Sequence, residues 1–315
     1  MVGSERRVSL SSIRRNEVEE MKILSFGEIL WDVYPEAKFI GGAPLNFAAH
    51  MAKHGHQVWM LSALGRDDLG AEAAKQLEAW GICTGYVSFS DTRETGRCLV
   101  TLSADAVPSY QLLSDVAYDE IACDQVAGSF DVLYFGTLAL RSAHNRAALK
   151  KLLSEHRFGE VFVDVNLRPP FVSGEVLRFA AEQATMLKIS REELGAVAQL
   201  LELTATDEES LARELSKRYE QLRCIVITRD ADGAYAWDSV RRQGCACAGE
   251  KVAVVSTVGA GDSFSAAFLH SCLCGKDLES CLSYAAKVAG YVVSQYDAVP
   301  EYNAEQFAET AEPVE

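Results

Sequence analysis

The chain has 315 residues, 49% of them hydrophobic, and a formal net charge of −15. This length and composition can bury a large core in one large domain or two small ones. The negative charge argues against nucleic acid and anionic membrane surfaces as general partners, because both bind basic patches. No apolar run reaches the length of a membrane span, and residues 1–20 lack the apolar centre of a signal peptide. We therefore expect a cytoplasmic protein that begins with a polar, disordered extension.

The nine cysteines also favour a reducing compartment, since they are odd in number and spread through segments that otherwise read as core. Cys245 and Cys247, like Cys272 and Cys274, are separated by one residue, which does not match the usual zinc knuckle. The histidines of residues 50–56 are explained by one helix face and a following turn. We expect no metal site built from these residues.

The first patterned segments of the chain carry polar groups at their ends. Residues 22–32 read as one buried strand that ends in Asp32, a carboxylate able to bind ligand hydroxyls or to cap a turn. Gly41 and Gly42 directly precede a helical pattern and allow a polar ligand to approach the backbone closely. Asn46, in the first turn of that helix, offers a donor and acceptors to a hydroxyl. A plain loop followed by a helix start is the alternative interpretation.

Strands and helices alternate along most of the chain. Short, β-branched-rich apolar runs are separated by helical patterns, which indicates an α/β fold with a mostly parallel sheet between two helical layers. Ligands of such a fold bind at the carboxyl ends of the strands. Residues 97–113 break the rhythm and predict a β-hairpin with its turn near residues 104–108. The predicted sheet strands are 58–64, 132–135, 161–165, 186–189 and 224–227.

The segment Ser256–Phe264 is the most informative in the chain, because it places two glycines and an acid where a strand turns into an apolar helix. Free amides at a helix N-terminus attract a phosphate, and glycine lets the phosphate come close. A carboxylate at Asp262 would repel a phosphate, but it could take a proton from a hydroxyl that attacks one. The simpler alternative is an ordinary helix start that is capped by Asp262.

The glycine pair at residues 41–42 and the Thr257–Asp262 motif together resemble the two hallmarks of the ribokinase-like, or PfkB-type, sugar kinases. Within that family the chain looks most like the bacterial fructokinases. The resemblance covers roughly residues 21–306, with an acidic tail at 307–315, and it implies a three-layer fold with a small β-sheet lid near residues 95–113. Further segments occur in the family's order: Gly27–Asp32, Asp164–Phe171, Leu187–Leu194 and Ile227–Ala234.

The resemblance implies a role for each matching residue. Asp262 would be the catalytic base, and the amides of Gly259, Ala260 and Gly261 would stabilise the transferring phosphoryl group. Glu193 would hold Mg²⁺ through water. The residues implied for the sugar are Asp32, Gly41, Gly42, Asn46, Asn166 and Arg168. Those implied for ATP are Lys188, Ser190, Glu193, Thr228, Gly233 and Gly261.

The sequence departs from the family at three positions. Ser190 stands where Asn is common, which is a frequent fructokinase variant. Ser256 replaces an Asp that helps to hold a monovalent cation, and Asp297 replaces a Gly in the same region. We therefore expect weak or absent potassium dependence. No Gly-x-x-x-x-Gly-Lys-Ser/Thr string occurs, which excludes the P-loop.

The predicted activity is ATP-dependent phosphorylation of a sugar hydroxyl, with fructose giving fructose 6-phosphate as the first choice. Ribose, tagatose and 2-keto-3-deoxygluconate remain alternatives, because one contact can redirect specificity. A catalytically silent relative that only binds sugar or nucleotide is the alternative from another functional class. A homodimer through the lid is the expected assembly.

Overall fold

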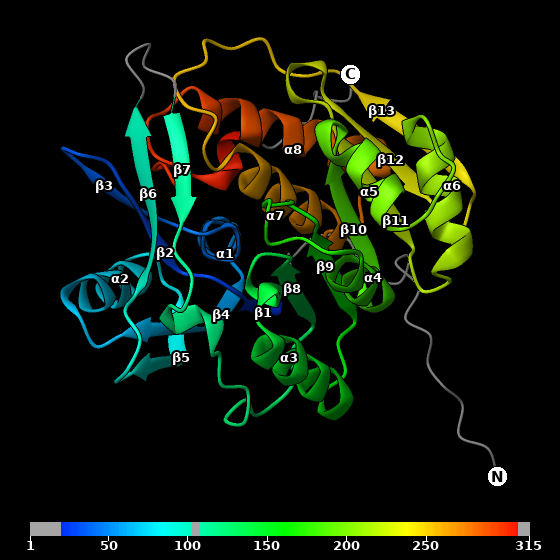
Figure 1. The fold of residues 1–315 in the computed structure, drawn as a ribbon. Helices are drawn as coiled ribbons and strands as arrows, with labels where there is room; N and C mark the ends of the chain where they lie inside the picture. Colours follow the sequence, from blue (N-terminus) through cyan, green and yellow to red (C-terminus); the bar gives the residue numbers. More distant parts are fainter. Residues whose placement is uncertain (1–19, 103–107, 308–315) are drawn as a thin grey trace.

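The computed structural model describes residues 20–102 and 108–307 of the chain (Figure 1). A nine-stranded sheet runs through it in the order β13-β12-β11-β10-β9-β8-β1-β4-β5. All neighbours from β11 to β5 pair in parallel, whereas β12 and β13 are antiparallel. The five strands predicted from the sequence are confirmed. The bounds are β1 Lys22–Phe26, β4 Gln57–Gly65, β5 Cys83–Ser90, β8 Val132–Gly136, β9 Glu160–Asp164, β10 Met186–Ser190, β11 Cys224–Thr228, β12 Ala234–Asp238 and β13 Gln243–Cys247.

Helices cover both faces of this sheet and form the outer layers of the expected three-layer fold. Helices α1, α2, α7 and α8 pack in one hydrophobic cluster, and α3 to α6 pack in the other. The α-helices are α1 Ala43–Lys53, α2 Asp68–Ala79, α3 Ala143–Glu155, α4 Gly174–Gln183, α5 Leu194–Leu200, α6 Glu208–Arg218, α7 Ala260–Leu273 and α8 Leu278–Val293.

The apolar strands supply both clusters at once, because successive side chains of a strand point to opposite faces. In β1, Ile23 belongs to the α1/α7 side and Leu24 to the α3/α4 side. Phe162 and Val163 of β9 divide in the same way. Burial on both faces explains why these strands read as continuous apolar runs in the sequence.

A separate four-stranded sheet in the order β3-β2-β6-β7 lies to one side of the main body (Figure 1). Strands β6 and β7 are antiparallel, with Cys98 opposite Leu112, so the hairpin predicted at 97–113 is confirmed. Its turn falls partly outside the described residues. The bounds are β2 Leu30–Val33, β3 Lys38–Gly41, β6 Gly96–Leu102 and β7 Pro108–Leu112.

The prediction of a single strand over residues 22–32 is wrong. Strand β1 ends at Phe26 in the large sheet, and β2 begins at Leu30 in the small one. The chain changes sheets at Gly27, whose φ is +148° and where an added Cβ would lie 2.5 Å from Pro44 Cγ. Apolar residues on both sides of Gly27 hid this break in the sequence. Asp32 therefore projects from the small sheet rather than from the end of a central strand.

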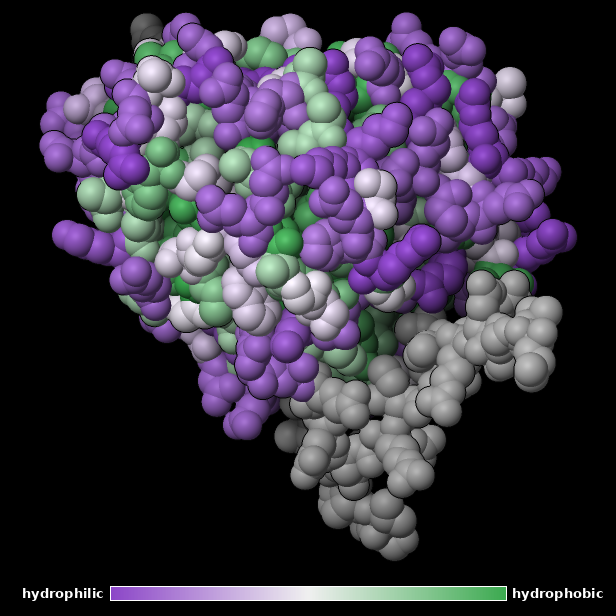
Figure 2. Space-filling view, turned by 90° about the horizontal axis from the view of Figure 1, so that it is seen from below, coloured by the Kyte–Doolittle hydropathy of each residue, from purple (hydrophilic) through white to green (hydrophobic). Residues whose placement is uncertain are grey.

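The outer surface is mainly polar. Seen from below, the coloured part of the surface is mostly hydrophilic, with apolar residues in small, scattered groups (Figure 2). Within residues 20–102 and 108–307, no helix is long and apolar enough to cross a bilayer. The buried apolar side chains are thus concentrated between the sheets and their helices, which hold the loops at the strand ends in place.

Candidate active site

The turn before α7 has the geometry of an anion site. Gly259 adopts a left-handed conformation with φ +80°, and an added Cβ would lie 2.5 Å from the carbonyl oxygen of Ala298. The amide of Ala260 donates to Thr257 O at 3.3 Å. The amides of Gly259 and Gly261 make no hydrogen bond to any residue that the structure describes. Two of the three predicted donors are therefore free, at the positive end of a 14-residue helix.

Asp262 lies in the first turn of α7 and is only 9% exposed. Asn46 Nδ2 of α1 donates a hydrogen bond of 2.8 Å to Asp262 Oδ2. Burial raises the pKa of Asp262 to about 6, and the nearby charge of Asp164 acts in the same direction. The Asn46 hydrogen bond and the charges of Lys188 and Arg168 lower the pKa by less. A carboxyl group with this pKa is ionised at pH 7 and still basic enough to accept a proton in a reaction.

Lys188 and Asp164 form a buried ion pair below the same turn. Lys188 Nζ lies 2.7 Å from Asp164 Oδ2, and the two residues are 5% and 2% exposed. Ser265 Oγ, one turn along α7 from Asp262, donates to the same carboxylate oxygen at 3.1 Å. An added Cβ on Gly261 would lie 3.3 Å from Lys188 Nζ. A positive charge therefore lies against Gly261, in the first turn of the helix where an anion would bind.

The predicted sugar residues converge from three segments. An added Cβ on Gly41 would lie 3.4 Å from Asp32 Oδ2, so the end of β3 faces the β2 carboxylate. Gly42 has φ +119°, and its Cβ would meet Glu28 O at 2.4 Å. Burial raises the pKa of Asp32, while a Cys98 hydrogen bond and the charge of Arg168 lower it. The positive φ and the close approach to Glu28 require glycine at position 42, whereas a Cβ at position 41 would make an ordinary contact.

Arg168 brings the next loop to the same place. Its charge acts on the pKa values of Glu28, Asp32 and Asp262, so it lies near all three carboxyls. Its side chain is exposed, and its hydrogen bond to Leu167 O, at 3.2 Å, is internal to the loop. Asn166, with φ +39°, holds the left-handed turn that leads into this loop.

Glu28 is a site residue that the sequence motifs did not single out. It is 3% exposed, and its Oε2 has no hydrogen-bond partner among the described residues. Burial raises the pKa of Glu28 to about 7, despite the amides of Glu28 and Ala43 and the charge of Arg168. The signal was an acid in the middle of the apolar run 23–31, directly after the glycine that breaks the strand.

Four of the residues predicted for the nucleotide, Ser190, Glu193, Thr228 and Gly233, lie at or just after the ends of β10 and β11. Ser190 pairs with Thr228 at the last position of the two strands. Gly233 has φ +95°, and an added Cβ would lie 2.1 Å from Cys247 O. Glu193 accepts the amide of Ser190 at 2.8 Å through Oε2 and the amide of Leu167 through Oε1. Glu193 thus ties the Ser190 turn to the Arg168 loop.

A carboxylate oxygen has two lone pairs, so each Glu193 oxygen can still accept a hydrogen bond from water. Direct ligation of a metal ion by Glu193 would compete with both amides. In the part of the chain that the structure describes, no three His, Cys, Asp or Glu side chains are grouped to hold a metal ion. A divalent ion at this edge would therefore be held mainly by phosphate oxygens and water, as Mg²⁺ often is.

Comparison with known proteins identifies the family. A family model described as "pfkB family carbohydrate kinase" matches residues 18–303. The chain belongs to the pfkB family of carbohydrate kinases. It is an ATP-dependent carbohydrate kinase, as the resemblance of its motifs implied.

Curated relatives of this kinase carry a different substrate name from the one we expected. The 5-dehydro-2-deoxygluconokinase of Bacillus thuringiensis is 26% identical over 298 residues, which are 87% of each chain. Fructokinase with bound ATP from Xylella fastidiosa has a TM-score of 0.77 at 20% identity and covers 88% of this kinase and 94% of that chain. Aminoimidazole riboside kinase from Salmonella enterica has a TM-score of 0.77 at 21% identity, with coverages of 91% and 98%. The structural likenesses support the fold and leave the sugar open.

Proposed function

We propose that this kinase transfers the γ-phosphoryl group of ATP to a hydroxyl of a hexose, with fructose as the first candidate and fructose 6-phosphate as its product. The observation that carries the proposal is the Asn46–Asp262 hydrogen bond at the start of α7, beside the free amides and Lys188. A base and an anion site within one helix turn suit attack by a hydroxyl on a phosphate.

In the proposed reaction, the sugar hydroxyl gives its proton to an Asp262 oxygen while its own oxygen forms the bond to the γ-phosphorus. The bond from that phosphorus to the bridging oxygen breaks, and ADP leaves with its electron pair. The amides of Gly259 and Gly261 and the ammonium of Lys188 stabilise the charge on the phosphoryl oxygens. Asn46 holds the Asp262 carboxylate in place for the proton.

Mg²⁺ fits this scheme, and Glu193 would hold it through water, because the carboxylate oxygens can still accept hydrogen bonds. When bound, it would neutralise negative charge on the ATP phosphates during transfer. Glu193 itself keeps the Ser190 and Leu167 backbone in register, and so orients the nucleotide edge relative to Arg168.

The carboxyls of the candidate active site favour a neutral, hydroxyl-rich substrate. Glu28, Asp32 and Asp262 present acceptors to hydroxyl donors, and Glu28 Oε2 has no partner of its own among the described residues. A free polyol supplies the missing donors without adding negative charge. Buried polar groups of this kind discriminate strongly against molecules that leave them unpaired.

A sugar acid is the second candidate, favoured by Arg168 and by the names of the curated relatives. Within the described residues, Arg168 forms no ion pair, so its guanidinium is available to a substrate carboxylate. The match to 5-dehydro-2-deoxygluconokinases points to the same chemistry.

The test measures ADP release with ATP and Mg²⁺ for wild type, Asp262→Asn and Arg168→Met. The substrates are fructose, ribose, tagatose, 2-keto-3-deoxygluconate and 5-dehydro-2-deoxygluconate. We expect fructose turnover that collapses in Asp262→Asn and is reduced less in Arg168→Met. Selective turnover of a sugar acid that is lost in Arg168→Met would transfer the proposal to the second candidate. ATP binding with no turnover on any sugar would favour the catalytically silent alternative.

Potassium dependence is expected to be weak or absent. Ser256 is half-buried in the loop before the catalytic turn, and Gly259 of that turn packs on the backbone of Ala298, next to Asp297. Replacing potassium with tetramethylammonium should leave most of the activity. A loss comparable to that of a potassium-requiring relative would contradict this expectation.

We also propose a homodimer through the small sheet. Phe39 of β3 and Tyr110 of β7 are 48% and 58% exposed there, which is unusual for large aromatic side chains. Light scattering at micromolar concentration should give the mass of two chains. A monomeric mass would contradict this assembly.

A further inference from the structure

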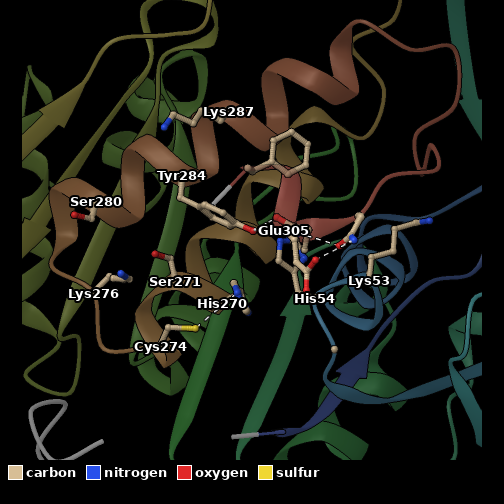
Figure 3. Close-up of a pocket in the computed structure, with 14 residues that line it drawn as sticks. Lys53, His54, His270, Ser271, Cys274, Lys276, Ser280, Tyr284, Lys287 and Glu305 are labelled. Atoms are coloured by element: carbon tan, nitrogen blue, oxygen red, sulfur yellow. Dashed lines mark hydrogen bonds between the residues drawn. The ribbon is translucent and has the colours of Figure 1, made fainter. Parts of the chain in front are cut away.

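A pocket lies at the ends of α1 and α7 that are opposite the candidate active site. Helices α1 and α7 present Asn46 and Asp262 in their first turns, and this pocket is lined by residues from their last turns and the loops beyond. The two ends of each helix are about 15–20 Å apart at a rise of about 1.5 Å per residue. The cavity volume is about 510 Å³, within the range of small-molecule sites. Helix α8 and residues 303–307 complete the wall (Figure 3).

The lining of this pocket is basic although the whole chain is strongly acidic. Lys287 lies on α8, where Ser280 and Tyr284 also line the pocket, and Lys276 lies in the loop before α8 (Figure 3). Neither lysine forms an ion pair with a described residue. Lys287 is in the middle of α8, so the helix dipole does not account for its position.

The other charged lining residues do not cancel this charge. Lys53 at the opposite side pairs with Glu301 at 3.2 Å and points away from Lys276 and Lys287 (Figure 3). Glu305 is the acidic residue of the lining, next to Asn303. Lys276 before α8 and Lys287, about three turns along the helix, thus remain available to an anion.

His54 gives the pocket a second and independent polar feature. His54 is 6% exposed, and its Nδ1 lies 2.7 Å from the carbonyl oxygen of His50. A carbonyl only accepts, so Nδ1 carries the proton and donates it. Burial lowers the pKa of His54, which keeps the ring neutral. Nε2 is then a bare lone pair, and it has no partner among the described residues.

The neighbouring histidines do not share this property. His56 Nε2 and His270 Nδ1 lie 3.0 Å apart, and the remaining nitrogens of these two rings contact the Met21 amide and the Cys274 thiol. The unpaired acceptor of His54 therefore requires a hydrogen-bond donor from outside the cluster. A buried acceptor left without a donor is destabilising, so a ligand that supplies one gains affinity.

We propose that this pocket binds a small phosphate monoester that carries hydroxyl groups, at a site separate from the active site. The phosphate lies against Lys276 and the Ser280 hydroxyl, and Lys287, about three helix turns away, adds to the positive potential of the pocket. A ligand hydroxyl donates to His54 Nε2. A molecule the size of a sugar phosphate fits the 510 Å³ volume and has both groups.

Binding of glucose 6-phosphate to the full chain, followed by titration calorimetry, tests this proposal. In Lys276→Ala/Lys287→Ala we expect at least tenfold weaker binding, because the charge-assisted contact of Lys276 and the charge of Lys287 are both gone. The matched control is Lys150→Ala/Lys217→Ala, which removes the same charge from exposed positions on α3 and α6 and should bind within twofold of wild type. Binding that is unchanged in the first variant, or undetectable in wild type at millimolar ligand, would overturn the proposal.

Two further variants separate the alternatives. His54→Phe keeps the ring against His270 and Tyr284 but removes the acceptor, so it should weaken glucose 6-phosphate and leave sulfate, which has no donor at neutral pH, unaffected. Equal weakening of both would contradict the role of Nε2. Loss of binding in Lys188→Met, with Lys276→Ala/Lys287→Ala unaffected, would assign the ligand to the active site and refute a second site. Thermal unfolding of each variant confirms that it is folded.

Discussion

The ionisation of Asp262 should set the lower pH limit of catalysis, and the hydrogen bond from Asn46 should shift that limit. Asp262 must be ionised to take a proton, so kcat/KM should fall as the pH drops through about 6, its raised pKa, and not through the ordinary value of 3.8. The opposing bond from Asn46 Nδ2 is 2.8 Å long and stabilises the ionised form. Removing it should therefore move the limit to higher pH.

The magnitude follows from the strength of that bond. A hydrogen bond to a charged group contributes about 1.5–3 kcal/mol, and one pKa unit corresponds to about 1.4 kcal/mol. In Asn46→Leu, which is similar in size and keeps water out, the acidic limb of kcat/KM should move up by about 1–2 units, to roughly pH 7–8. Alanine would be a poorer choice, since water entering the space would lower the pKa again.

The assay is kcat/KM from pH 5 to 9 with whichever sugar gives turnover. Glu28, with a pKa of about 7, interacts with Asp262, so the two carboxyls titrate as a pair. Repeating the series in Glu28→Gln isolates the Asp262 limb. Asp262→Asn is the control for the base and should lose about 10²–10⁴ in rate. A limb that stays near pH 6 in Asn46→Leu, with only KM raised, would refute the proposed role of this bond and leave Asn46 as a sugar contact alone.

Three stability predictions follow from the same site. The pKa of Glu28 is raised from 4.5 to about 7 in the folded chain, so its ionisation lowers the free energy of unfolding as the pH rises from 5 to 8. In urea unfolding at pH 8, the free energy of unfolding of Glu28→Gln should exceed that of wild type by about 2–3 kcal/mol. At pH 5 the difference should be much smaller. Lys188→Met leaves Asp164 buried without its partner and should lower the free energy of unfolding by about 3–5 kcal/mol. Adding Asp164→Asn should restore part of this loss, and no recovery would contradict the ion-pair explanation. Gly259→Ala places a Cβ 2.5 Å from Ala298 O at a φ of +80°, and it should lower the free energy of unfolding by about 1–3 kcal/mol and greatly reduce kcat. Normal activity of this variant would show that catalysis does not depend on the conformation of the turn.

Local sequence patterns were sufficient to predict much of the secondary structure of this molecule. The α/β alternation, the hairpin and the glycine turns were predicted because strand periodicity, turn residues and helix starts are encoded by neighbours in the chain. Gly42, Gly233 and Gly259 each turned out to need the absence of a side chain, through a positive φ and a close approach. Their importance can be read locally because the backbone conformation belongs to the residue itself.

The path of residues 22–32 shows where local reading fails. Both halves of this segment are apolar and extended, and only Gly27 marks the change of sheet. Which sheet a strand joins depends on pairing partners that are distant in the sequence, β4 and β8 for one half and β3 and β6 for the other. Single-chain periodicity contains no information on that choice.

The sequence by itself determined the fold class, the glycine turn before α7 and the residue types of the candidate site. Only the tertiary structure decided that Asn46 would meet Asp262 across 216 positions, that Lys188 would pair with Asp164, and that Glu28 would be buried beside them. The reason is physical, since the raised pKa values come mainly from burial and from neighbours that different strands and helices supply. Burial and long-range proximity exist only once the sheet order has placed the ends of β1, β9 and β10 next to the first turns of α1 and α7.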